Sequence, residues 1–113
     1  MNKIPWRTAV ALVVLASGAL AQSGNAAENG KRVFLKDGCY ECHGTVAQGG
    51  TGPRLTPPAI ALSTLTAVVR KGVGGMPPYS SKVLSDAELS DIHAYLETIP
   101  APPPAKSIAL LNQ

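Results

Sequence analysis

The chain has 113 residues, a formal net charge of +3 and 45% apolar residues, so its length suits one small domain. Aromatic residues make up only 4%, which leaves few large side chains for a core, and a large apolar cofactor would supply the missing volume. The basic residues form no stripe interleaved with aromatic residues, so we expect no nucleic-acid partner.

Residues 1–27 have the pattern of a secretory signal peptide. Lys3 and Arg7 precede the apolar run TAVALVVLASGALA, and small residues permit cleavage after Ala21 or Ala27. The alternative is an uncleaved membrane anchor, but a spanning helix needs roughly 20 apolar residues, more than this run offers. We therefore expect export to a bacterial periplasm and no membrane span in the mature form. Without the two N-terminal basic residues, the 10 basic residues become 8 against 7 acidic ones, which is nearly neutral.

The first helix of the domain is predicted within residues 26–39. An apolar patch at residues 33–35 faces away from the basic side chains of this segment, and Gly38 is the expected stop. Gly30 lies four residues before Phe34 on the same face. Because a glycine weakens a helix, its position here suggests the close approach of another helix; the alternative is that it merely lies in a fraying helix start.

Two Gly- and Pro-rich loops are predicted, over residues 44–60 and 73–83, with a helix between them. In that helix, residues 63–72, Leu65, Val68 and Val69 recur at helical spacing. We expect Ser63 to cap its start and Gly72 its end.

The last helix is predicted between a capping box, formed by Ser85 and Glu88, and Pro100. Its apolar face consists of Leu89, Ile92, Leu96 and Ile99, with Tyr95 at the edge. The sequence has no period-two run and no hairpin turn, so the domain over residues 28–100 is predicted to be all-α. The Pro-rich tail, residues 101–113, is expected to be poorly ordered or draped on the surface.

The stretch CYECH holds both cysteines of the chain, Cys39 and Cys42, and one of its two histidines, His43. A redox dithiol is one interpretation, but no strand precedes the motif as it does in thioredoxin-like proteins. A structural zinc site with His93 as its fourth ligand is a second, and the ligand spacing does not match. A simple disulfide would close a tiny loop with little stabilisation.

A covalently attached haem accounts for all the residues of this motif, since C-x-x-C-H is the attachment signature of a c-type haem. The two thiols would form thioethers with the vinyl groups, and His43 would be the proximal iron ligand. Tyr40 and Glu41, between the cysteines, are expected to face outward. The sequence therefore predicts one haem c bound through Cys39 and Cys42.

Met76 is the predicted sixth ligand of the iron. It is the only methionine beyond residue 1, and it lies in a loop before two prolines that restrict the backbone. The alternatives are a buried methionine without a ligand role, and ligation by His93 from the last helix. A His/Met pair raises the potential relative to two histidines and leaves no open site, which favours electron transfer over catalysis.

Together, these residues resemble the class I c-type cytochromes, of the small monohaem bacterial periplasmic kind, over about residues 28–100. The resemblance implies a cytochrome c fold with three to four short helices around one haem. In that family an N-terminal helix with Gly and an aromatic residue four positions later crosses the C-terminal helix. Gly30 and Phe34 match the first helix, and Leu89, Tyr95 and Leu96 match the second.

The resemblance also assigns roles within two loops. The stretch TGPRL matches the family's Gly-Pro-x-Leu, which implies that the Pro53 carbonyl accepts a hydrogen bond from His43 and that Leu55 packs on the haem. The family's Met-Pro step matches Met76 and the proline after it. Tyr79 is expected to contact a haem propionate, as are Arg54 and Arg70.

We therefore expect a one-electron carrier rather than an enzyme, with a redox donor and a redox acceptor as partners. Residues 72–99 also resemble the cytochrome subunits of bacterial periplasmic dehydrogenases. A dedicated subunit of such a complex is thus the alternative, with a terminal oxidase as a further possible partner. A haem-based gas sensor, in which Met76 dissociates, is the third hypothesis. The chain would be a monomer or a subunit of a complex.

Overall fold

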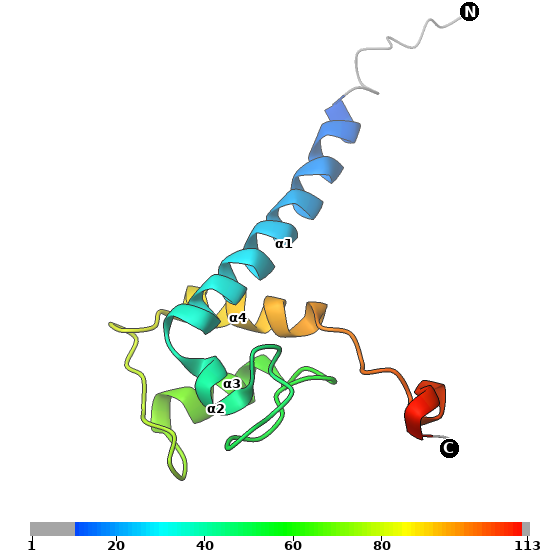
Figure 1. The fold of residues 1–113 in the computed structure, drawn as a ribbon. Coiled ribbons are helices and arrows are strands. Elements are labelled where there is room, and N and C mark those ends of the chain that lie inside the picture. The colour runs from blue at the N-terminus through cyan, green and yellow to red at the C-terminus, as the bar shows by residue number, and fades with distance from the viewer. Residues whose placement is uncertain (1–10, 112–113) are drawn as a thin grey trace, which may run out of the picture.

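The computed structural model describes residues 11–111, with side chains from Gly24 onward, and shows helices joined by loops (Figure 1). The helices are α1 (Ala11–Lys36), α2 (Cys39–His43), α3 (Leu62–Lys71) and α4 (Asp86–Thr98), followed by the 3-10 turns η2 (Ala105–Ser107) and η3 (Ala109–Leu111). Within this range there is no strand, only an isolated bridge between Val73 and Met76. The predicted all-α class is confirmed.

Helix α1 begins at Ala11, well before the helix predicted within residues 26–39. The helices of the described range are all too short or too polar to cross a membrane. The predicted signal peptide includes residues 1–10, which lie outside that range, so the signal and its two cleavage positions stay predictions.

Helices α1 and α4 pack on each other more extensively than any other pair, and Figure 1 shows α4 crossing the C-terminal part of α1. Gly30 lies at the crossing, where a Cβ atom added to it would be 1.9 Å from the carbonyl oxygen of Asp91. Asn29 Nδ2 donates to Asp91 Oδ2 beside it, at 2.6 Å. The close helix approach predicted at Gly30 is confirmed.

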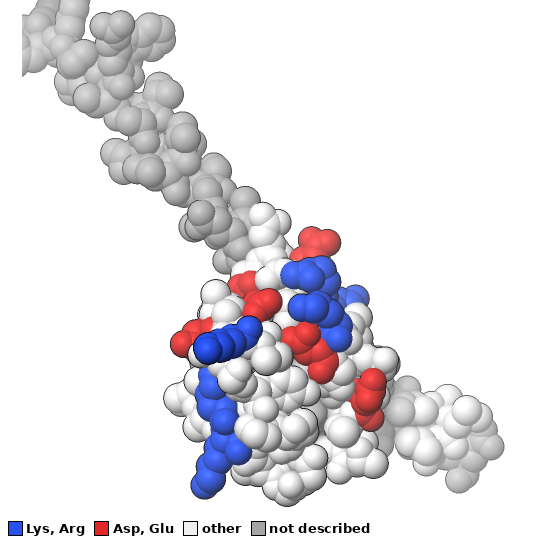
Figure 2. All heavy atoms as spheres, turned by 90° about the vertical axis from the view of Figure 1, so that its left-hand side faces the viewer, with Lys and Arg blue, Asp and Glu red and all other residues white. Residues whose placement is uncertain are grey.

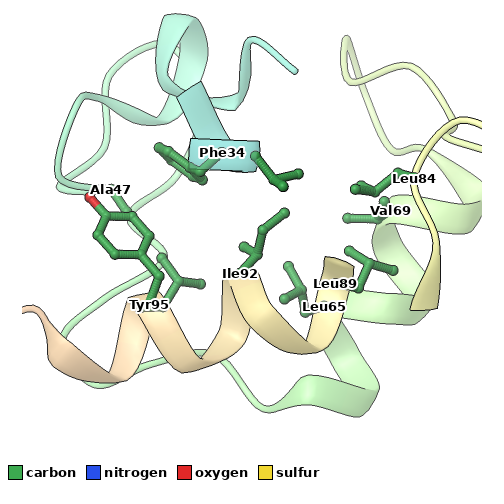
Figure 3. Packing of buried hydrophobic residues seen from close by; sticks show 10 residues of the cluster. Phe34, Ala47, Leu65, Val69, Leu84, Leu89, Ile92 and Tyr95 are labelled. Carbon is green, nitrogen blue, oxygen red and sulfur yellow. The ribbon is translucent and has the colours of Figure 1, made fainter. Parts of the chain in front are cut away.

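The buried core draws on α1, α3, α4 and the loops beside them (Figure 3). The rings of Phe34 and Tyr95 pack with their centroids 5.7 Å apart and their planes at 56° to each other. Aromatic pairs prefer a tilted arrangement of this kind. Tyr95 was expected at the edge of the apolar face but is buried, and its hydroxyl donates to Thr45 O at 3.3 Å. The full cluster is Val33, Phe34, Ala47, Leu65, Val69, Leu84, Leu89, Ile92, Tyr95 and Leu96.

The caps of α3 and α4 agree with the sequence prediction in two cases and differ in one. The capping box of Ser85 and Glu88 is present at the start of α4, and Gly72 closes α3. The predicted cap at Ser63 is wrong, because α3 already begins at Leu62 with Ala61 in the N-cap position. The Leu65 amide bonds the Ala61 carbonyl at 2.9 Å, which places Ser63 inside the first turn.

The tail leaves α4 and extends away from the rest of the fold (Figure 1). Every residue from 101 to 111 is exposed, and Leu110 and Leu111 are 79% and 64% exposed. Of the two expectations for the tail, draping on the surface is not what the structure shows, and poor order stays a prediction. The turns η2 and η3 were not predicted. Hydrogen bonds within the tail include Ser107 N to Pro104 O, at 2.8 Å.

Candidate functional site

Helix α2 is a single turn that presents the CYECH motif. It follows Gly38, whose φ of 77° turns the chain sharply after α1, and it ends where the Gly44 amide bonds Tyr40 O at 2.9 Å. His43 is buried, while Tyr40 and Glu41 are exposed as predicted. The motif thus directs its histidine into the protein and its two intervening residues toward solvent.

The imidazole of His43 is held by the loop that follows α2. Its Nδ1 lies 2.7 Å from the carbonyl oxygen of Pro53, the hydrogen bond that the resemblance implied. A carbonyl can only accept, so Nδ1 carries the proton and Nε2 keeps a free lone pair. This tautomer is the one a metal-ligating histidine uses, with the donated hydrogen bond fixing the ring's orientation.

Main-chain hydrogen bonds fasten this loop to α2. Gly52 N donates to Cys42 O at 2.9 Å, and Gly49 N donates to His43 O at 2.8 Å. A Cβ atom on Gly52 would lie only 2.9 Å from His43 Cε1 and 3.0 Å from Nδ1. Gly52 therefore lets the loop approach Cε1 and Nδ1 of the ring closely, a role that the sequence interpretation missed. The signal was available, since Gly52 is the glycine of the TGPRL stretch.

Both cysteines carry free thiols in this structure. Burial, with a smaller contribution from the negative charge of Asp37, raises the pKa of the Cys39 thiol to about 11. In a redox dithiol the attacking cysteine has a lowered pKa, and Cys39 does not have one. The geometry accordingly gives no support to the redox-dithiol interpretation.

His93, the alternative ligand, lies on α4 with its Nδ1 3.7 Å from Glu97 Oε2 and its side chain 19% exposed. Among the side chains described, from residue 24 to 111, no three of the types His, Cys, Asp and Glu gather as a metal site would require. A zinc site built from Cys39, Cys42, His43 and His93 is therefore not assembled in this fold.

Met76 and Leu55, which come from different loops, are both half-buried and pack against the hydrophobic core. The Met76 amide donates to Val73 O at 2.9 Å, which closes a tight turn at the tip of the loop between α3 and α4. A thioether sulfur and a neutral imidazole are a known ligand pair for haem iron.

Tyr79 packs against the same core, and its hydroxyl donates to Asp37 O at 3.3 Å, which links the Met76 loop to the turn between α1 and α2. Burial is the main cause that raises the pKa of this phenol, so it stays protonated as a donor. Cys42, Pro77 and Tyr79 line one open hollow of about 540 Å³.

The residues present fit a covalent haem. The Pro53 bond leaves His43 Nε2 available, the two thiols have no disulfide partner, and Met76 and Leu55 are half-buried rather than exposed. The structure thus brings the predicted residues onto α2, the loop behind it and the α3–α4 loop. Which of them hold the cofactor is taken up as a proposal below.

Comparison with known proteins identifies the family of the chain. The family model described as cytochrome C oxidase, cbb3-type, subunit III matches residues 25–96. A curated relative, the cytochrome c subunit of 4-cresol dehydrogenase [hydroxylating] from Pseudomonas putida, is 31% identical over 101 residues, covering 85% of this chain and 87% of the relative. No solved structure matches significantly. The chain belongs to the cytochrome c domains of the cbb3-type subunit III family and is a cytochrome c electron carrier.

Proposed function

We propose that the protein is a periplasmic one-electron carrier with a single haem c attached to Cys39 and Cys42. His43 and Met76 would ligate its iron, and Pro53, Leu55 and Tyr79 would line its site. The observation that carries the proposal is the 2.7 Å contact from His43 Nδ1 to Pro53 O, because it leaves Nε2 as the only nitrogen for a metal. When bound, the haem supplies the ferrous–ferric couple.

The chain's own residues would keep the reorganisation energy of electron transfer low. Two thioethers and two axial side chains would keep the same geometry in both oxidation states, and the ring of His43 is already held by Pro53. Ligation by both His43 and Met76 would leave the iron no position for a substrate, which favours a carrier over an enzyme.

A partner would dock beside Cys42, where the hollow opens and where Tyr40 and Val83 are exposed apolar side chains. Figure 2 shows charges of both signs intermixed near α1 and a broad uncharged area below them. Such a surface supports weak apolar docking more than long-range electrostatic steering.

Visible spectra of the purified periplasmic protein test the axial ligands. The wild type should show haem c spectra with the weak sulfur-to-iron band of the ferric state, and Met76→Ala should lose that band. Two controls, Val73→Ala from the same loop and His93→Ala, should keep it. A band that disappears in His93→Ala and persists in Met76→Ala would overturn the assignment.

Intact mass of the same preparation tests the attachment and the export signal. The mass should exceed that of the processed chain by one haem and identify cleavage after Ala21 or Ala27. Rapid carbon monoxide binding by the reduced wild type would instead favour the gas-sensor function, since a six-coordinate carrier binds it poorly.

A second candidate function is a dedicated cytochrome subunit of a periplasmic dehydrogenase. The relative from Pseudomonas putida favours it, because that protein is a dehydrogenase cytochrome subunit and the alignment spans 87% of its length. Isolation from the native source decides between the two candidates. Recovery with a larger subunit at fixed stoichiometry supports the second, and recovery as a free monomer that reduces a terminal oxidase supports the first.

A further inference from the structure

Arg70, near the end of α3, holds the loop that carries Met76. Its Nη1 donates to Tyr79 O at 3.0 Å and to Leu84 O at 2.7 Å, and its Nη2 donates to a carboxylate oxygen of Asp86. The side chain is only 23% exposed. The resemblance suggested that Arg70 contacts a propionate, but both terminal nitrogens are engaged by acceptors of the protein itself.

These contacts connect the two ends of the segment 79–86, which leads from the Met76 turn into α4. Tyr79 lies three residues after Met76, and Leu84 and Asp86 lie where the loop enters α4. Tyr79 is also held by its amide, which donates to Val69 O at 2.9 Å, and by its hydroxyl on Asp37 O. Arg70 is therefore the one side chain in the described part of the chain recorded with hydrogen bonds to both Tyr79 and Leu84.

The chemistry of the contacts suits a rigid link. Hydrogen bonds from a guanidinium are stronger than neutral ones, and its planar fork places several donors at fixed angles. Leu84 is almost fully buried, so its carbonyl would lose a partner that water cannot easily replace. An uncharged side chain at position 70 would leave residues 79–86 with fewer restraints.

We propose that Arg70 is the positioning residue for the sixth haem ligand, keeping the α3–α4 loop ordered so that the Met76 thioether stays on the iron. The proposal rests on Met76 ligation as proposed above. A methionine on a loose loop must order that loop each time it binds, and the entropy of ordering opposes ligation. Because Arg70 already orders the loop in the folded protein, the state in which Met76 has left the iron is rare.

Imidazole competition on the oxidised holoprotein measures the population of that state, because imidazole binds the iron only when Met76 has left. The apparent dissociation constant scales inversely with the open fraction. For Arg70→Gln we expect the apparent dissociation constant to fall at least about tenfold, the effect of losing even one of the three charge-assisted hydrogen bonds of Arg70. Arg70→Lys keeps the charge without the fork and should give an intermediate value. Lys71→Gln, the exposed neighbour with the same charge change, should match the wild type.

A second control separates positioning from general stability. Thr56→Val removes the buried bond from Thr56 Oγ1 to Leu96 O, far along the chain from the Met76 loop, and should lower the thermal midpoint without changing imidazole affinity. The reduced Arg70→Gln protein should also bind carbon monoxide faster than the wild type.

Three results are decisive. Equal imidazole affinity in Arg70→Gln and wild type would overturn the proposal while leaving Met76 ligation intact. If the apparent dissociation constant for imidazole changed as much in Thr56→Val as in Arg70→Gln, the role of Arg70 would be general stability, and the proposal would be overturned as well. A wild type without the sulfur-to-iron band would refute Met76 ligation first, and this proposal with it.

Discussion

The crossing of α1 and α4 depends on the missing side chain of Gly30, and Gly30→Ala tests this directly. The added Cβ would lie 1.9 Å from the carbonyl oxygen of Asp91, 2.3 Å from its carbonyl carbon and 2.7 Å from the amide nitrogen of Ile92. All three are main-chain atoms, so no rotamer change relieves the clash. The helices would have to separate by about 1 Å at their closest point.

The size of the effect follows from two opposing terms. Overpacking of this kind costs roughly 1–3 kcal/mol, and main-chain contacts place this case near the upper end. Alanine is about 1 kcal/mol better than glycine in a helix, which offsets part of the loss. The net destabilisation is about 2 kcal/mol, equivalent to a thermal midpoint about 8–16 °C lower for a domain of this size.

Thermal unfolding of the haem-loaded protein, followed by far-ultraviolet circular dichroism, measures this difference. Ser90→Ala is the matched control, because it raises helix propensity at an exposed position of α4 beside Asp91. That control should be neutral or slightly stabilising. If Gly30→Ala were as stable as the control, the helix crossing would not depend on close approach at Gly30, and the reasoning would fail.

Three further substitutions probe the cap, the core and a buried hydrogen bond. Backbone and side-chain hydrogen bonds from Ser85 lower the Glu88 pKa below its ordinary 4.5, so Glu88→Gln should lower the thermal midpoint at neutral pH, with the difference vanishing as pH falls through the folded pKa. Phe34→Ala should cost about 3–5 kcal/mol in denaturant unfolding. Thr56→Val, which leaves the Leu96 carbonyl without its 2.9 Å bond, should cost about 1–3 kcal/mol in the same assay.

The outcomes that would contradict these three expectations differ in kind. If the difference in thermal midpoint between wild type and Glu88→Gln widened in acid, the carboxylate would not be what stabilises the helix start. A cost for Phe34→Ala no larger than that of Val83→Ala, at a 63% exposed position, would mean that Phe34 is not a core residue. An unchanged unfolding midpoint in Thr56→Val would mean that water replaces the lost bond.

Features that depend on local chemistry could be predicted from the sequence. The spacing of Cys39, Cys42 and His43 is a property of one helical turn, and the capping box joins residues three apart. Gly30 was predictable for a different reason, because a glycine on an apolar helix face has few explanations besides close packing.

Other features depend on where distant segments meet, and the sequence does not specify this. Ser63 failed as a cap because the N-cap of α3 lies two residues earlier, at Ala61. The acceptors of Arg70 are mostly main-chain carbonyls, whose identity depends on the path of a loop rather than on residue type. Gly52 was visible in the sequence, but its contact with His43 exists only once the loop has folded back on α2.

The contact of Gly52 with His43 leads to a prediction about the reduction potential. An alanine at this position would place its Cβ 2.9 Å from Cε1 and 3.0 Å from Nδ1, so the ring must shift by a few tenths of an ångström. That shift would lengthen the 2.7 Å bond from Nδ1 to Pro53 O. The bond makes the imidazole a stronger donor to the metal, and the ferric ion benefits from a strong donor more than the ferrous ion.

Gly52→Ala should therefore raise the potential of the haem. A tenfold loss of ferric over ferrous preference corresponds to about 59 mV for a one-electron couple, so we expect a rise on the order of tens of millivolts. Spectroelectrochemical titration of the holoprotein measures the shift, with Thr51→Ala, the exposed neighbour, as a control that should match the wild type. An unchanged or lower potential in Gly52→Ala would show that the Pro53 bond does not tune the iron through His43.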